Sequence, residues 1–133
     1  MIRAEQPPQI EATERASLRR RVKQMYERFN QGLWDTCFEL LDPKLREKAN
    51  VESFAYVDSL RSFKNCYGAI TPWYIRLSLH LDASANKFDD RPFAYVYVIW
   101  QDERHGFHMF KERWVKESGH WFSRVAGLVT NQA

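Results

Sequence analysis

Residues 110–122, FKERWVKESGHWF, consist of two runs of alternating polar and apolar residues on either side of Ser118 and Gly119. Alternation with a period of two is typical of β-strands. Gly119 tolerates the positive φ angle that closes a short hairpin loop. We therefore predict a β-hairpin with Glu117 and Ser118 at the centre of the turn and Gly119 as a bulge residue.

The register of this hairpin decides which side chains share a face of the sheet. The predicted turn gives two cross-strand pairs, which are Val115 with Trp121 and Trp114 with Phe122. Further from the turn, Glu112 then lies opposite Arg124, on the face that carries Trp114. This register predicts an ion pair between Glu112 and Arg124 inside the protein.

The period of two also occurs in the segments that precede the hairpin. We expect four strands, at residues 73–81, 93–100, 107–116 and 120–129. The turn DERHG (102–106) pairs Trp100 with His108, and a longer polar loop covers residues 82–90. Successive strands joined in this way form an antiparallel meander.

Residues 13–63 repeat their apolar side chains at helical spacing instead. We expect three helices, at residues 13–31, 34–41 and 50–63, with an exposed connection at residues 44–49. Thr13 and Asn50 are suited to cap the first and third helices, and Gly32 and Pro43 end the first two. Helices followed by strands indicate an α+β fold, with three N-terminal helices packed on a strongly curved four-stranded antiparallel sheet.

The chain of 133 residues has the length of one domain, and its composition, 44% hydrophobic and 15% aromatic, is sufficient for a core. We expect a flexible N-terminal tail at residues 1–12, the domain at residues 13–129 and a short tail at residues 130–133. The expected core residues come from both the helices and the sheet: Leu18, Val22, Met25, Phe29, Phe38, Phe54, Leu77, Val98, Phe110 and Trp114.

Charge and cysteine content narrow the classes of function. A net charge of +3 and a pI near 8.9 are only mildly basic, so we do not expect a nucleic-acid partner. No apolar run approaches the length of a membrane span, and residues 1–12 contain no signal peptide. This favours a cytoplasmic location for the sequence as it stands, or export if a leader has been removed. Cys37 and Cys66 form no CxxC pair, which leaves both reduced thiols and a disulfide open.

The first helix running into GLWDTCFELLDP (32–43), together with RWVKESGHWF (113–122), resembles the nuclear transport factor 2-like superfamily. The resemblance covers residues 13–129 and implies a cystatin-like, cone-shaped α+β barrel with a pocket between helices and sheet. The superfamily contains ketosteroid isomerases and other enzymes as well as many non-catalytic domains. The segment LDPKLREKAN (41–50) is too short for the strand and catalytic loop of the enzymes, so we transfer no catalytic residue from them.

The candidate pocket combines aromatic rings with a few polar groups, as small-molecule sites do. We expect it to be lined by Tyr26, Trp34, Trp100, His108, Glu112, Trp114 and Arg124. Glu112 could serve as a general base, but a carboxylate paired with Arg124 is more often a structural ion pair. The four histidines show no metal-ligand spacing, and we expect neither a metal nor a cofactor.

The other face of the sheet mixes tyrosines with lysine and arginine, a composition typical of partner surfaces. We predict a homodimer that uses Tyr95, Tyr97, Met109 and Trp121. The sequence thus favours a non-enzymatic domain that binds a small apolar ligand or a protein partner. Two alternatives stay open: an isomerase or lyase of the ketosteroid-isomerase type that uses Glu112, and a purely structural dimerisation module.

Overall fold

The computed structural model describes residues 8–48, 53–82 and 90–124. These residues form helices and strands in the following order: α1 (Pro8–Asn30), α2 (Trp34–Phe38), α3 (Pro43–Lys48), α4 (Ser53–Tyr67), β1 (Thr71–His80), β2 (Phe93–Gln101), β3 (Phe107–Glu117) and β4 (His120–Ser123). The α+β class is confirmed. The predicted N-cap Asn50, the C-terminal end of the fourth predicted strand and the tail at residues 130–133 lie outside the described residues.

The described part of the chain contains four helices, where the sequence predicted three. The additional helix is α3, in the segment that was predicted to be an exposed connection. Proline is favourable in the first turn of a helix, where its missing N–H would have no partner, and Pro43 occupies that position. The Asp42 carboxylate accepts a hydrogen bond from the backbone N–H of Lys44 at 3.1 Å, which caps the new helix.

Helix α1 begins at Pro8 rather than at Thr13, so part of the predicted tail is helical. The Thr13 hydroxyl donates to the Gln9 carbonyl at 2.7 Å within the helix, instead of capping its first turn. The C-terminal end is as predicted. Gly32 has a φ of 73°, and the N–H of Leu33 donates to the carbonyl of Arg28 at 2.9 Å. This is the hydrogen bond of a glycine-terminated helix.

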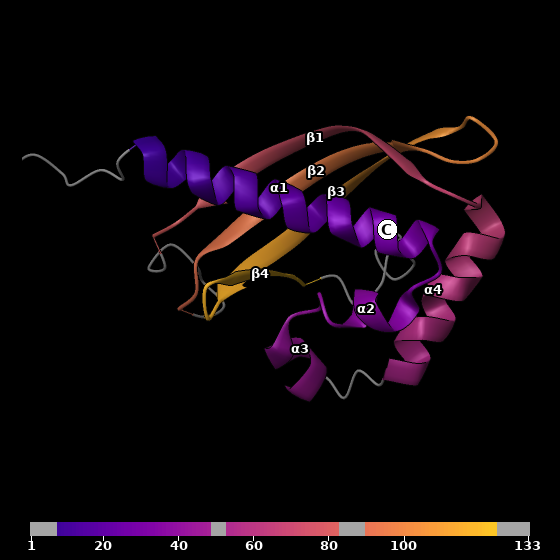
Figure 1. Ribbon diagram of the computed structural model, residues 1–133, viewed down its shortest axis with the longest axis horizontal. Helices are drawn as coiled ribbons and strands as arrows, with labels where there is room; N and C mark the ends of the chain where they lie inside the picture. Colours follow the sequence, from indigo (N-terminus) through magenta and orange to yellow (C-terminus); the bar gives the residue numbers. More distant parts are fainter. Residues whose placement is uncertain (1–7, 49–52, 83–89, 125–133) are drawn as a thin grey trace, which may run out of the picture.

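The strands form one antiparallel sheet in the order β1-β2-β3-β4. The predicted pairing of Trp100 with His108 is confirmed. Figure 1 shows α1 running along one face of this sheet, with α2, α3 and α4 grouped together beside it. No described helix covers the opposite face, which we call the outer face.

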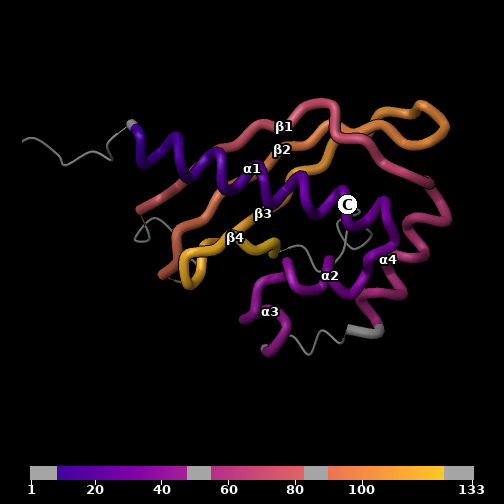
Figure 2. The backbone as a smooth tube through the Cα atoms, in the orientation of Figure 1, coloured from indigo at the N-terminus to yellow at the C-terminus, as the bar shows by residue number. Residues whose placement is uncertain are grey.

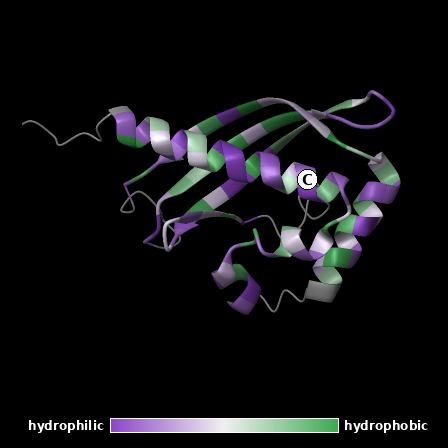
Figure 3. Ribbon diagram, viewed as in Figure 1, coloured by the Kyte–Doolittle hydropathy of each residue, from purple (hydrophilic) through white to green (hydrophobic). Residues whose placement is uncertain are grey.

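The face toward α1 holds the core, as predicted for β2 and β3. Its fully buried members include Val96, Val98, Trp100 and Trp114, and α1 contributes Leu18, Val22, Met25 and Phe29. The mixed colouring of α1 in Figure 3 reflects its alternating polar and apolar sides. Phe38 and Phe110 are only partly buried, and the Phe54 side chain lies outside the described residues.

The register of the β3–β4 hairpin differs from the prediction by one residue. Ser118 and Gly119, with φ values of 52° and 83°, are the two central residues of the turn, which contains no bulge. Two positive φ angles define the type I′ turn, whose twist matches that of the flanking strands. The observed pairs are therefore Glu117 with His120, Lys116 with Trp121, Val115 with Phe122 and Trp114 with Ser123. The shift exchanges the two faces of β4.

Both outer edges of the sheet are partly covered by side chains or backbone of the same protein. On β1, the carbonyls of Ile75 and Leu77 accept hydrogen bonds from Arg19 at 2.9 Å and Arg15 at 3.1 Å. Along β4, the segment before α3 forms a parallel bridge between Leu41 and Ser123, and Figure 2 shows this segment passing beside the strand. These contacts occupy part of each edge and make the addition of a strand from another chain less favourable.

Candidate functional site

Three of the predicted pocket residues meet inside the core. Glu112 is 3% exposed, and its two carboxylate oxygens accept hydrogen bonds from the Tyr26 hydroxyl at 2.8 Å and from the Trp114 indole N–H at 2.9 Å. Burial raises the pKa of Glu112, although both hydrogen bonds act in the opposite direction. Burial and the neighbouring carboxylate raise the pKa of Tyr26. The three side chains form a closed polar cluster within the packed interior.

Arg124 does not pair with Glu112, so the predicted ion pair is wrong. Because of the shift in register, Ser123 lies opposite Trp114 and Arg124 follows the end of β4. The Arg124 guanidinium contacts the Asp42 carboxylate at 2.8 Å instead.

Asp42 is the centre of a buried ionic network that the sequence did not indicate. It is 0% exposed and receives two hydrogen bonds from Arg91, at 2.6 and 2.9 Å, besides the one from Arg124. Arg91 also contacts Glu117 at 3.1 Å. Burial by itself would raise the pKa of Asp42, but the arginine hydrogen bonds outweigh it and the pKa is lowered. This arrangement is that of a structural network, since the oxygens of Asp42 are occupied by protein donors.

The other predicted pocket residues are dispersed. Trp100 is buried in the core and stacks on His108, with ring centroids 4.3 Å apart. His108 contacts Asp102 in the β2–β3 turn at 2.8 Å, and this hydrogen bond lowers the pKa of Asp102. Trp34 lies away from them and lines a hollow at the surface.

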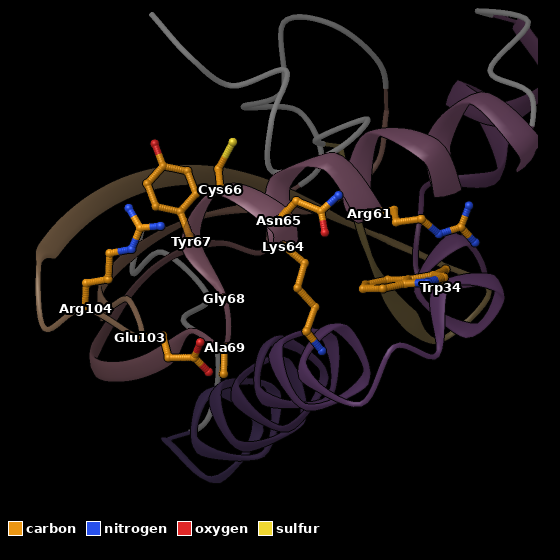
Figure 4. A pocket seen from close by; sticks show the side chains of 10 residues that line it. All are labelled: Trp34, Arg61, Lys64, Asn65, Cys66, Tyr67, Gly68, Ala69, Glu103 and Arg104. Atoms are coloured by element: carbon orange, nitrogen blue, oxygen red, sulfur yellow. The ribbon is translucent and has the colours of Figure 1, made fainter.

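That hollow has a volume of about 380 Å³ and lies between α4 and the β2–β3 turn, with Trp34 of α2 at one side. Figure 4 shows Trp34 and Arg61 on one side, Glu103 and Arg104 on the other, and Lys64 between them. Of the seven predicted pocket residues, only Trp34 lines it. Sequence reasoning missed the others because they come together only when the turn folds back over the end of α4, where Glu103 N–H donates to the Tyr67 carbonyl at 3.0 Å.

The predicted dimer surface needs one correction. Tyr95 and Tyr97 are partly buried on the outer face and Met109 is 70% exposed, but Trp121 is 0% exposed and lies inside. Its indole N–H donates to Glu14 of α1 at 3.1 Å. The one-residue shift in the β4 register turned this tryptophan inward and placed Phe122 on the outer face.

Large exposed apolar side chains gather instead at one end of the outer face. We call them the apolar end: Trp73, Tyr74, Phe107 and Met109. The sheet brings them together because Tyr74 and Met109 both pair with Ile99, and the Trp73 and Phe107 rings lie 5.9 Å apart. A bulge between Pro72 and Tyr74 disturbs the alternation of β1 at Trp73.

Cations lie over the aromatic rings in the middle of the outer face. Arg76 and Lys111 lie 4.4 Å from the ring centroids of Tyr97 and Tyr95, and Arg113 lies 5.0 Å from that of Phe93. Such contacts between a cation and the face of an aromatic ring are favourable.

The described part of the chain has few side chains that could bind a metal ion or react as a thiol. Within residues 8–48, 53–82 and 90–124, no three His, Cys, Asp or Glu side chains come together to hold a metal ion. Cys37 and Cys66 are both free thiols, one buried and one exposed, and burial raises the pKa of Cys37 to about 12. None of the described helices is long and apolar enough to cross a membrane.

Comparison of the chain with protein-family models, with curated proteins and with solved structures finds no match. A functional assignment therefore depends on the geometry of the molecule. Three features of the described residues bear on it: the closed Glu112 cluster, the apolar end of the outer face and the hollow beside α4.

Proposed function

We propose that this chain is a non-enzymatic binding domain that pairs with a second copy of itself through the apolar end of its outer face. The observation that carries the proposal is the exposure of the four side chains: 64% for Trp73, 54% for Tyr74, 59% for Phe107 and 70% for Met109. Single exposed apolar residues are common on monomers, but a contiguous aromatic patch is typical of an interface.

The arrangement of the rest of the sheet supports this choice of surface. Both edges of the sheet are partly covered, by Arg15 and Arg19 on β1 and by the Leu41 segment on β4. Pairing by addition of a strand is therefore disfavoured, and association through a face is favoured.

The cation–ring contacts bear on where the contact lies. Arg76, Lys111 and Arg113 lie over rings in the middle of the outer face, and a two-fold contact centred there would have to accommodate these cations. A contact centred on Phe107 and Met109 keeps these cations at its rim.

We further propose that the fold is of the nuclear transport factor 2-like kind, on the resemblance given above and on the passage of α1 along one face of a four-stranded meander. The isomerase alternative has weaker support. The raised pKa of Glu112 is what a general base needs, but both its oxygens already accept hydrogen bonds and it is 3% exposed. An internal apolar ligand is also disfavoured, because Tyr26, Trp100 and Trp114 fill the interior.

Sedimentation equilibrium of the full chain, between about 1 and 100 μM, tests the dimer. We expect a dimer for the wild-type chain and a dissociation constant raised at least about tenfold by Phe107→Lys or Met109→Lys, since central apolar residues dominate an interface. Ile10→Lys is the matched control, because Ile10 is 43% exposed and belongs to α1. A monomeric wild-type chain, or equal weakening by the control, would overturn the proposal.

A further inference from the structure

Two aromatic side chains, Trp34 and Tyr67, line the hollow beside α4. The Tyr67 ring is fixed by contacts with Trp100 at 5.5 Å and His108 at 5.1 Å between centroids. Trp34 packs edge-on against Phe29 at 5.5 Å, with the two ring planes 71° apart. A volume of about 380 Å³ falls within the range of small-molecule sites, so these walls can hold a ligand of modest size.

The charges that line the hollow are unequal. Three cationic side chains, those of Arg61, Lys64 and Arg104, line it together with one carboxylate, that of Glu103. Lys64 is held in place, because its ammonium donates to the Asn30 carbonyl at 2.5 Å and lies 5.6 Å from the Trp34 ring centroid. Arg61 and Arg104 are exposed, and within residues 8–48, 53–82 and 90–124 neither has an ion-pair partner. The hollow therefore has two guanidinium groups that remain available to a ligand.

We propose that this hollow binds a small organic anion that carries a carboxylate or phosphate group on a flat ring. Arginine binds both oxyanions through two parallel hydrogen bonds, and its guanidinium needs no change of protonation to do so. The ring of the ligand packs against the Trp34 side of the hollow, next to Arg61 and Lys64. This site is independent of the apolar end of the outer face, so either proposal can fail alone.

Two features of the hollow disfavour the binding of an anion. They restrict where in the hollow its charged group can lie. The carboxylate of Glu103 repels it, and the C-terminal end of α4, which carries a partial negative charge, lines the hollow. A ligand must therefore keep its anionic group near Arg61 and Lys64, away from Glu103. A cation is not favoured in the same place, because it would face three positive side chains.

Nuclear magnetic resonance titration of the full chain, followed by the backbone and indole N–H signals, tests the site. The probes are benzoate and adenosine monophosphate, with benzamide and adenosine as neutral analogues and inorganic phosphate as an anion without a ring. We expect one or both ringed anions to shift the signals of residues 64–69 and of the Trp34 indole, and each neutral analogue to bind at least about tenfold more weakly. If only benzoate binds, the group is a carboxylate; if only adenosine monophosphate binds, it is a phosphate.

Three variants distinguish the loss of a contact with the ligand from general damage to the folded structure. Arg61→Gln should weaken the bound probe about tenfold or more, since a hydrogen bond to a charged group is lost. Glu103→Gln should strengthen binding severalfold, because it removes the opposing charge, and this is a gain that damage to the structure would not produce. Arg20→Gln, on the exposed side of α1, removes the same charge elsewhere and should leave binding unchanged.

The proposal is overturned if neither benzoate nor adenosine monophosphate shifts these signals at concentrations up to about 10 mM. It is also overturned if inorganic phosphate binds as well as the ringed anions, or if Arg20→Gln weakens binding as much as Arg61→Gln. Sedimentation of the same samples shows whether dimer formation is affected, which distinguishes failure of this site from failure of the proposed function.

Discussion

Two carboxylates are buried among the described residues, and their surroundings shift their pKa values in opposite directions. Asp42 is 0% exposed and Glu112 is 3% exposed. Asp42 is surrounded by two guanidinium groups, which lower its pKa despite burial. Glu112 receives hydrogen bonds only from neutral donors, and burial raises its pKa. The type of donor, more than the depth of burial, decides which form of a buried carboxyl is stabilised.

Replacing Glu112 by glutamine should be tolerated. The oxygen of the introduced amide can accept from Trp114, and its N–H can donate to the Tyr26 hydroxyl, so both contacts survive without a buried charge. In contrast, Tyr26→Phe leaves one carboxylate oxygen without its donor and should cost about 1.5–3 kcal/mol at neutral pH. Urea denaturation of both variants measures the difference. Equal losses would show that the charge of Glu112 itself is required.

At the scale of elements, the turn of the β3–β4 hairpin decides which side chains of β4 are buried. Ser118 and Gly119 both have positive φ angles, which only a few residue types adopt without strain. The two-residue turn sets the register, and the register directs Trp121 into the core and Phe122 outward. A turn with one more residue would bury the other face of β4.

Two substitutions in this turn should change stability in opposite directions. Ser118→Asn should stabilise the protein by a few tenths of a kcal/mol, because Asn-Gly is the favoured pair of the type I′ turn. Gly119→Ala should destabilise it by about 1–2 kcal/mol. A Cβ at Gly119 would have nothing within 4 Å, so the loss would come from its φ of 83° alone. Thermal denaturation compares the two, and a neutral Gly119→Ala would contradict the observed turn.

At the scale of the whole molecule, the Asp42 network joins segments that are distant in the sequence. Asp42 precedes α3, Arg91 precedes β2, Glu117 ends β3 and Arg124 follows β4. The network therefore connects the helical part of the chain to three places in the sheet. Removal of a single buried partner leaves uncompensated charges, which is the costly way to alter such a network.

Asp42→Asn should destabilise the protein by about 3–5 kcal/mol at pH 7. The pKa of Asp42 is lowered on folding, so its contribution is present above the unfolded-state pKa and is lost as pH falls through the folded-state pKa. The wild-type chain should therefore lose more stability between neutral and acidic pH than Asp42→Asn does. Urea denaturation at several pH values measures this.

Two further comparisons make this prediction specific. Arg91→Met should cost more than Arg124→Met, because the Arg91 side chain is 9% exposed and that of Arg124 is 33% exposed. The raised pKa of Glu112 has the opposite sign, so its contribution is present at low pH and is lost as pH rises through the folded-state pKa. Parallel pH curves for the wild-type chain and Asp42→Asn would contradict the role of the network.

The sequence by itself determined the α+β class, the order of the strands, the pairing of Trp100 with His108 and most of the core of α1, β2 and β3. These follow from the spacing of apolar residues, which reports burial along one element at a time. The sequence also indicated an aromatic outer face. It did not indicate the apolar end of that face, because the bulge at Trp73 interrupts the alternation.

Only the tertiary structure decided the features on which the proposals depend. Periodicity does not show whether a turn has two residues or three, and that single difference moved Trp121 into the core and Arg124 away from Glu112. The Asp42 network and the hollow at Arg61 and Arg104 each join residues from separate elements. Such contacts depend on how the elements pack, which is a non-local property that the spacing within one segment does not contain.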